Sequence, residues 1–312
     1  MNIRRPYAAG SFYPGTAEAL KETVHAYLEG AVLPQDLPSG EIIALMAPHA
    51  GYLYSAAVAA PAYKLLPQAD CDTIVIIGHD FGRGAGDIIA VMDDHDAFDT
   101  PLGPVQVDTE LVHALEAEDG RFIVHNRIHS QEHSVEIHLP FIKTLKPEAK
   151  IVPMLFGDAT PSNCRALASS LKKLAADRRI LIFASTDLSH YPTYSFAQKI
   201  DKITIDCIKH NSVEQLCKRA HTVEHELVCD IDSFKRECER AEITGISAGF
   251  PEMVQVERIP ICSAGGVGTA MAWCESLGSC KVRILHRANS GDVPGGDHKR
   301  VVGYASAAFF RI

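Results

Sequence analysis

Apolar, β-branched runs recur along the chain, with helical patterns between them. The runs "TIVIIG" (Thr73–Gly78) and "ILIFAS" (Ile180–Ser185) are apolar on both faces instead of alternating. Strands of this kind are covered by helices on both sides of a sheet. The pattern predicts strands at Ile42–Ala47, Thr73–Gly78, Ile88–Val91, Lys150–Phe156, Ile180–Ser185, Val282–His286 and Val301–Phe310.

Helical periodicity fills most of the intervals between these runs. It predicts helices at Thr16–Leu28, Leu53–Leu66, Thr109–Glu118, Ser162–Ala176, Phe196–His210, Val213–Arg219, Cys229–Ala241 and Gly266–Leu277. Strands that alternate with helices indicate an α/β fold with a central, mostly parallel or mixed sheet flanked by helices. The chain has no internal repeat and no Pro/Ser-rich linker, so we expect a single domain over residues 1–312.

Three predicted strands are each followed by a histidine. His49 follows the first strand, His79 the second, and His190 comes shortly after Ile180–Ser185, with Asp187 between them. Ligands of open α/β sheets bind beyond the carboxyl ends of the strands. Imidazole is both a common metal ligand and a general base near neutral pH. One such histidine could equally be a packed structural residue, but three at one predicted edge indicate a site. Tyr54, just after His49, is a candidate for lining it.

The segment 131–140 carries another polar cluster, formed by His133, Glu136 and His138. On a helix His133 and Glu136 would share a face. The alternation of Val135, Ile137, Leu139 and Phe141 instead favours an extended segment, with a helix starting near Pro140. The three polar residues could be ligands, supports for ligands, or a buried hydrogen-bonded network. We favour the supporting role, and we interpret the other histidines, such as His129 and His221, as lying outside the site.

Nine cysteines are irregularly spaced and form no CxxC motif, which argues against a disulfide framework or a zinc ribbon. Cys262 is the exception of interest, because it precedes Ser263-Ala264-Gly265-Gly266 and the start of a predicted helix. A helix N-terminus stabilises a thiolate. We therefore expect Cys262 to be a functional thiol and the others to be inert.

Composition narrows the classes of partner. The 312 residues carry a formal net charge of −9 and no long basic run, which argues against nucleic acid and against an anionic membrane surface. No apolar run approaches the ~18 residues of a membrane helix, and no signal peptide is evident at the first residues. We expect a cytoplasmic protein with a small-molecule or peptide ligand; the oligomeric state is not predicted.

Several long motifs together resemble the Memo family, which includes the B component of the AmmeMemoRadiSam system. These are "RRPYAAGSFYPG" at 4–15, "APHAGYLYSA" at 47–56, "EHSVEIHLPF" at 132–141, "STDLSHY" at 185–191, Cys262 and "VVGYAS" at 301–306. The resemblance implies a fold related to class III extradiol dioxygenases, which use non-haem Fe(II). It also implies a cleft with two histidines and a cysteine, here His49, His79 and Cys262, as metal ligands. His190 and Asp187 would line the same cleft as catalytic residues.

The second histidine departs from the pattern of the family, which usually has Gly-Pro-x-His after that strand. Here the residues are Gly78-His79-Asp80-Phe81, so Phe81 occupies the usual ligand position and His79 stands two residues earlier. A shift of two residues along a strand keeps the same face and moves the side chain by about 6–7 Å. Either His79 replaces the ligand or the metal site is altered.

Three hypotheses for the function follow. The first is a dioxygenase-like oxidoreductase that holds Fe(II), although histidine and thiolate suit copper and zinc as well. The second is a binding protein that keeps the fold and cleft and recognises a peptide or small molecule without turnover. The third is a metal-free thiol enzyme with Cys262 as its nucleophile and His49 or His190 as its base.

Overall fold

An eight-stranded mixed sheet forms the centre of the protein in the computed structural model, which describes residues 2–79, 87–175, 178–229 and 253–312. In spatial order its strands are β12 (Cys280–Asn289), β13 (Gly303–Arg311), β2 (Glu41–Ala47), β9 (Ile180–Ser185), β3 (Thr73–Gly78), β8 (Lys150–Phe156), β4 (Ala90–Met92) and β7 (Phe122–Val124). The central strands β2, β9, β3 and β8 run parallel to one another. β13 and β4 flank this group in the antiparallel direction.

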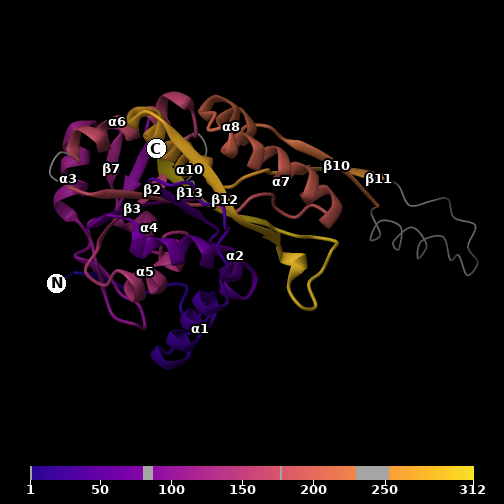
Figure 1. Ribbon diagram of the computed structural model, residues 1–312, viewed down its shortest axis with the longest axis horizontal. Coiled ribbons are helices and arrows are strands. Elements are labelled where there is room, and N and C mark those ends of the chain that lie inside the picture. The colour runs from indigo at the N-terminus through magenta and orange to yellow at the C-terminus, as the bar shows by residue number, and fades with distance from the viewer. Residues whose placement is uncertain (1, 80–86, 176–177, 230–252) are drawn as a thin grey trace, which may run out of the picture.

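Helices cover both faces of the sheet, as the doubly apolar strands require (Figure 1). On one face α10 (Ala264–Leu277) packs against β9, β13, β2 and β3, with α6 (Pro161–Leu174) and α8 (Val213–Ala220) outside it. On the other face α2 (Tyr52–Leu65) lies against β12, β13 and β2, with α1 (Ala17–Gly30) and α5 (Leu139–Leu145) beside it. The other α-helices of the described residues are α3 (Thr109–Glu118), α4 (Asn126–His129) and α7 (Tyr194–Lys209).

Helix α10 reaches the sheet closely because its first turn is built from small residues. A Cβ atom on Gly265 would lie 2.0 Å from the ring of Phe156, and one on Gly266 would lie 2.8 Å from the carbonyl oxygen of Ile77. Both substitutions would push the helix off the sheet. This close approach brings the segment before α10, including Cys262, to the carboxyl ends of the central strands.

The predicted elements agree with the structure where the pattern is strong. β3, β8, β9 and α3 have the predicted bounds, and the other main strands and helices differ by a few residues at their ends. The sequence pattern did not reveal the short strands and helical turns. These are β1 (Ile3–Arg4), β5 (Ala97–Phe98), β6 (Val105–Gln106), β7, α4, η1 (Leu66–Gln68), η2 (Glu136–His138) and η3 (Ser290–Asp292). The pattern also did not reveal the longer strand β11 (Met253–Arg258).

Two predictions of local structure were wrong. The alternating segment 135–141 is not extended: it forms the 3-10 turn η2 and continues into α5, so both sides of this turn are buried in the core. Cys229 does not begin a helix but ends strand β10 (Glu224–Cys229), which pairs with β11 (Met253–Arg258). Residues 230–241 of that predicted helix lie outside the described residues. No helix among the described residues has the length and hydropathy needed to cross a membrane.

Candidate functional site

The three histidine-bearing strand ends lie side by side. β9 is paired with β2 on one side and with β3 on the other, all in the parallel direction. Their carboxyl ends therefore present His49, His79 and the segment 185–191 at a single edge of the sheet. The order β2-β9-β3 could not be read from the sequence, and it is what joins the three candidates into one site.

His49 is buried, and the proton on its ring can be assigned. Its Nδ1 lies 2.8 Å from Ser185 Oγ, and that hydroxyl donates its own proton to the carbonyl oxygen of Ser134 at 2.6 Å. Since the hydroxyl has one proton, it must accept from Nδ1–H of His49. The Nε2 lone pair is therefore free, and burial together with the neighbouring His133 and His79 holds the pKa of His49 well below its usual value.

Cys262 faces this free lone pair. Its Sγ lies 3.5 Å from Nε2 of His49 and accepts from the backbone N–H of Asp187 at 3.3 Å. Burial, and next the charge of Asp187, raise the pKa of the Cys262 thiol to about 12. Helix α10 begins only at Ala264, beyond Cys262, and burial outweighs any stabilisation of a thiolate by the helix dipole.

His79 is exposed and lies beside Cys262. Its Nδ1 is 3.1 Å from the carbonyl oxygen of Cys262, which can only accept, so Nδ1 carries the proton and Nε2 is free. Its backbone N–H donates to Ser134 Oγ at 2.9 Å, and its ring centroid lies 6.2 Å from that of His49. Asp80 and Phe81, which follow it, lie outside the described residues.

His190 shows the same pattern of protonation. Its Nδ1 donates to the carbonyl oxygen of Leu188 at 2.9 Å, which again leaves Nε2 free. The expected pairing of His190 with Asp187 is replaced by this carbonyl. The carboxyl of Asp187 instead accepts from the backbone N–H groups of His49, at 2.8 Å, and of Ala50, and burial raises its pKa to about 7. Asp187 thus holds the turn that carries His49.

The "STDLSHY" turn depends on a second buried carboxyl. Asp201 in α7 is 2% exposed and accepts from the backbone N–H of Ser189 at 3.0 Å. Burial raises the pKa of Asp201 to about 6, although the hydrogen bonds from Ser189 and the charges of Arg287 and Arg219 oppose this.

Ionising Asp201 therefore weakens the fold. Its folded-state pKa lies above the ordinary value of about 3.9, so the stability present below about pH 4 is lost as the pH rises through about 6. We expect Asp201→Asn to remove this loss and to gain roughly 1–3 kcal/mol over the wild type between pH 4 and pH 7. Urea unfolding of both proteins at several pH values measures the difference, and parallel pH profiles would contradict it.

One pair of side chains in the site has the spacing of two ligands of a single metal ion. Two ligand atoms at about 2.3 Å (sulfur) and about 2.0–2.1 Å (nitrogen) from one tetrahedral metal lie roughly 3.5 Å apart. The distance from Cys262 Sγ to His49 Nε2 fits this value. No three His, Cys, Asp or Glu side chains within the described ranges converge closely enough to hold a metal as they stand. A third ligand requires a side chain such as His79 to turn inward.

His133 contacts the histidine cluster directly, whereas Tyr54 lines a neighbouring pocket. The ring of His133 packs edge-on against His49, with centroids 5.7 Å apart, and on its other side contacts Phe12 at 4.5 Å. Burial lowers the pKa of His133. Tyr54 lies on the first turn of α2 and is 45% exposed beside a larger pocket.

Glu136 and His138 are fully buried but contact other groups. Glu136 receives hydrogen bonds from Arg4, from the N–H groups of Tyr7 and Ala8, and from the Tyr13 hydroxyl, each at 2.7 Å. It therefore fastens the N-terminal segment to the core, close to the site.

His138 has its Nδ1 2.5 Å from the Tyr63 hydroxyl. Burial lowers the pKa of His138 to about 3. His129, interpreted from the sequence as an ordinary polar residue, is also fully buried, with its Nε2 3.0 Å from the carbonyl oxygen of Val91. These two histidines belong to the core.

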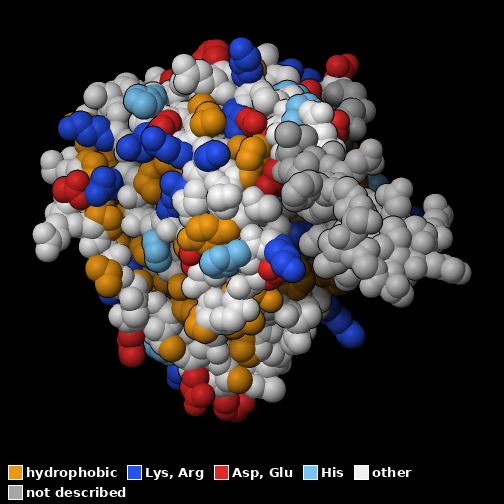
Figure 2. All heavy atoms as spheres, turned by 90° about the vertical axis from the view of Figure 1, so that its right-hand side faces the viewer, with side chains coloured by type: hydrophobic (Ala, Val, Ile, Leu, Met, Phe, Trp, Pro, Cys, Tyr) orange, Lys and Arg blue, Asp and Glu red, His pale blue; other side chains and the backbone are white. Residues whose placement is uncertain are grey.

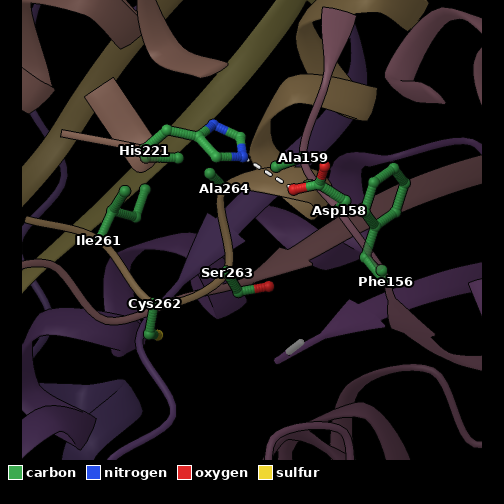
Figure 3. A pocket seen from close by; sticks show the side chains of 11 residues that line it. Phe156, Asp158, Ala159, His221, Ile261, Cys262, Ser263 and Ala264 are labelled. Carbon is green, nitrogen blue, oxygen red and sulfur yellow. Dashed lines mark hydrogen bonds and ion pairs between the residues drawn. The ribbon is translucent and has the colours of Figure 1, made fainter. Parts of the chain in front are cut away.

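A small pocket lies on the other side of the Cys262 backbone (Figure 3). His221 and Asp158 form an ion pair across it at 2.7 Å, and the carbonyl of Cys217 and this carboxylate raise the pKa of His221. The side chain of Cys262 points away from that pair. The pocket is therefore separate from the histidine cluster.

Sequence reasoning missed the two serines that orient the histidines. Ser185 sets the protonation of His49, and Ser134 links Ser185 to the backbone of His79. Both stand inside motifs that were singled out, directly beside candidate residues. Only the hydrogen-bond geometry distinguishes them from ordinary polar neighbours. Seven cysteines with described side chains are free thiols, and five of these seven are buried.

Comparison with known proteins identifies the family. The model of the Memo family, described as "Memo-like protein", matches residues 4–233. A MEMO1 family protein of Desulfurococcus amylolyticus is 32% identical, with 99% of this chain and 100% of that protein covered. MEMO1 family protein PAE0818 of Pyrobaculum aerophilum is 32% identical with both chains fully covered, and a MEMO1 family protein of Nitrosopumilus maritimus is 29% identical over 98% and 99%.

One solved structure, of the uncharacterized protein JW3007 from Escherichia coli K12, is similar at a TM-score of 0.45 with 10% identity. The match covers 85% of this chain and 99% of that protein. The three sequence relatives cover 98–100% of this chain. The chain belongs to the Memo family.

Proposed function

We propose that the histidine–cysteine cluster binds a transition-metal ion and that the protein is a metal-dependent, non-haem oxidoreductase. The observation that best supports metal binding is the pair formed by His49 and Cys262. The imidazole is held by Ser185 in the form whose Nε2 lone pair is free, and the cysteine sulfur lies 3.5 Å from it. Metal-binding histidines characteristically donate their other ring N–H to such an oxygen.

His79 is the third ligand in this proposal. Its Nδ1–H is occupied by the Cys262 carbonyl, and its exposed ring can turn about its side-chain bonds to bring Nε2 toward the His49–Cys262 pair. Histidine and thiolate ligands accept iron, copper and zinc, and iron is the metal that the family resemblance favours. A bound iron would supply redox and Lewis-acid chemistry.

The other residues of the site hold positions and protons. His190, with Nδ1–H fixed by Leu188, offers Nε2 as a proton acceptor for a bound substrate. Asp187 keeps the 49–50 backbone in place through its carboxyl and receives no ring N–H. A metal-free thiol enzyme is less well supported, because burial raises the pKa of Cys262 to about 12 and leaves little thiolate near neutral pH.

Elemental analysis tests the proposal. Protein purified without air and treated with a chelator is incubated with Fe(II), Cu or Zn, desalted, and measured for metal per chain. We expect close to one bound ion per chain for at least one of the three metals. Trace metal only, after all three incubations, would overturn the proposal and favour a protein that binds a ligand without metal.

A further inference from the structure

A pocket of about 510 Å³ opens beside the histidine cluster. It lies between the start of α2 and residues 290–304, and we call it the loop pocket. In Figure 1 the loop after β12 projects at the right, and Figure 2 turns that side toward the viewer. On this face hydrophobic side chains reach the surface among basic, acidic and histidine side chains. The volume is in the range typical of sites for small organic ligands.

The wall formed by the loop is held in a defined shape. Asn289 and Asp292 form a reciprocal capping box at η3, and the Tyr194 hydroxyl donates to Asp292 at 2.7 Å. The ring of His298 stacks on Tyr194 with centroids 4.4 Å apart, and its Nε2 lies 3.1 Å from the Gly291 carbonyl. The loop pocket is therefore formed before any ligand arrives, which reduces the cost of binding.

An aromatic ring is held into this pocket by an uncommon backbone conformation. Tyr191 has φ +62°, in the left-handed region that bulky residues rarely adopt. Its N–H donates to the Val301 carbonyl at 2.8 Å. The preceding residue, His190, forms isolated antiparallel β-bridges through its backbone with both Ile259 and Val302. The surrounding strands thus impose the conformation. The side chain of Tyr191 is left 49% exposed and lines the pocket together with the 45% exposed Tyr54.

The loop pocket adjoins the residues of the candidate site. Ala50 and Tyr191, which follow His49 and His190 directly, both line it. The backbone N–H of Leu188, the residue after Asp187, donates at 2.8 Å to the carbonyl oxygen of Gly303, which directly precedes the lining residue Tyr304. A ligand in the loop pocket would therefore lie next to the strand ends.

A cation, Arg300, and a carboxylate, Asp297, both line the loop pocket. Arg300 lies 4.8 Å above the ring of Tyr191 and, within the described part of the chain, has no ion pair or hydrogen bond. The acidic residue of the lining, Asp297, accepts the backbone N–H of Lys299. A guanidinium that is free of carboxylate partners beside exposed aromatic rings is suited to a planar ligand that carries a carboxylate.

We propose that the loop pocket binds a small aromatic carboxylate, with its ring against Tyr191 and Tyr54 and its carboxylate at Arg300. That this ligand is the substrate of the metal site rests on the proposed function. The binding itself does not, because every residue that carries it lies outside the histidine–cysteine cluster.

Ligand-observed NMR titration of the chelator-treated protein tests the proposal with three matched probes: indole-3-acetate, indole-3-acetamide and tryptamine. We expect the carboxylate to bind about three- to tenfold more tightly than the amide, as suits an exposed cation. Arg300→Gln should abolish this preference, Arg300→Lys should keep part of it, and Tyr191→Ala should weaken the carboxylate and the amide alike. The control Lys299→Gln changes a neighbouring cation outside the lining and should have no effect.

Equal binding of carboxylate and amide by the wild type, or a preference for the amine, would overturn the proposal. So would an unchanged preference in Arg300→Gln. The metal assay is independent of this titration. If the carboxylate binds in an Arg300-dependent way but the protein binds no metal, only the proposed function is refuted. Metal binding without that preference refutes only the loop-pocket proposal.

Discussion

Replacing Cys262 with serine, or His49 with alanine, should lower the affinity for the reconstituted metal by at least about a hundredfold. Each change removes one of the two ligand atoms that already lie 3.5 Å apart. The remaining side chains cannot complete a coordination sphere. Metal per chain after reconstitution and desalting, with a competition titration against a chelator, measures the loss.

Ser185→Ala is the more discriminating variant. It leaves both ligands in place but removes the oxygen that accepts Nδ1–H of His49, so the ring can change tautomer and turn. We expect a loss of about 10–100-fold in metal affinity, the range typical of such supporting groups. Circular dichroism and a urea midpoint show whether each variant is folded.

Two matched controls make the result specific. Cys280→Ser alters a half-buried thiol that donates to the Cys274 carbonyl, and His286→Ala alters an exposed histidine on β12. Neither should change metal content. If Cys262→Ser and His49→Ala bind metal as the controls do, the ion is held elsewhere and the assignment of ligands is wrong.

Glu136→Gln should destabilise the protein by about 3–5 kcal/mol, the range for breaking a buried ion pair. Glu136 is fully buried and accepts four hydrogen bonds, one of them from Arg4, which is itself only 4% exposed. The amide removes the charge that lies 2.7 Å from Arg4, leaves Arg4 with the Glu132 carboxylate at 3.8 Å, and turns a donor toward other donors. Urea unfolding followed by circular dichroism measures the free energy of unfolding.

The matched control is Glu110→Gln, at an 81% exposed carboxylate 3.5 Å from Arg178, where we expect a change within about 0.5 kcal/mol. Arg4→Gln should also be costly, and the double variant should lose less than the sum of the two single losses, because the pair is then removed together. A loss under about 1 kcal/mol for Glu136→Gln would show that this network does not secure the N-terminal segment.

The fold was predictable where a long apolar run had to be buried on both faces. "TIVIIG", "KIVPMLF" and "ILIFAS" became strands with the expected bounds, since nothing but a covered sheet hides them. Prediction failed at short elements. The 3-10 turn at Glu136–His138 is stabilised by contacts with Arg4, Tyr13 and Tyr63, which are distant in the sequence. The local pattern of apolar and polar residues contains no information about those contacts.

The sequence by itself determined the strand ends, and with them His49, His79 and His190 as candidates, because a polar residue after a buried strand must lie at the edge of the sheet. Only the tertiary structure decided that β9 lies between β2 and β3, which brings these ends together. The tertiary structure also determined which ring nitrogens of the histidines are free. It showed that Glu136 binds the N-terminal segment and that Arg300 lies over the ring of Tyr191. The physical reason is that sequence patterns record burial, whereas a site depends on distances between segments far apart in the chain.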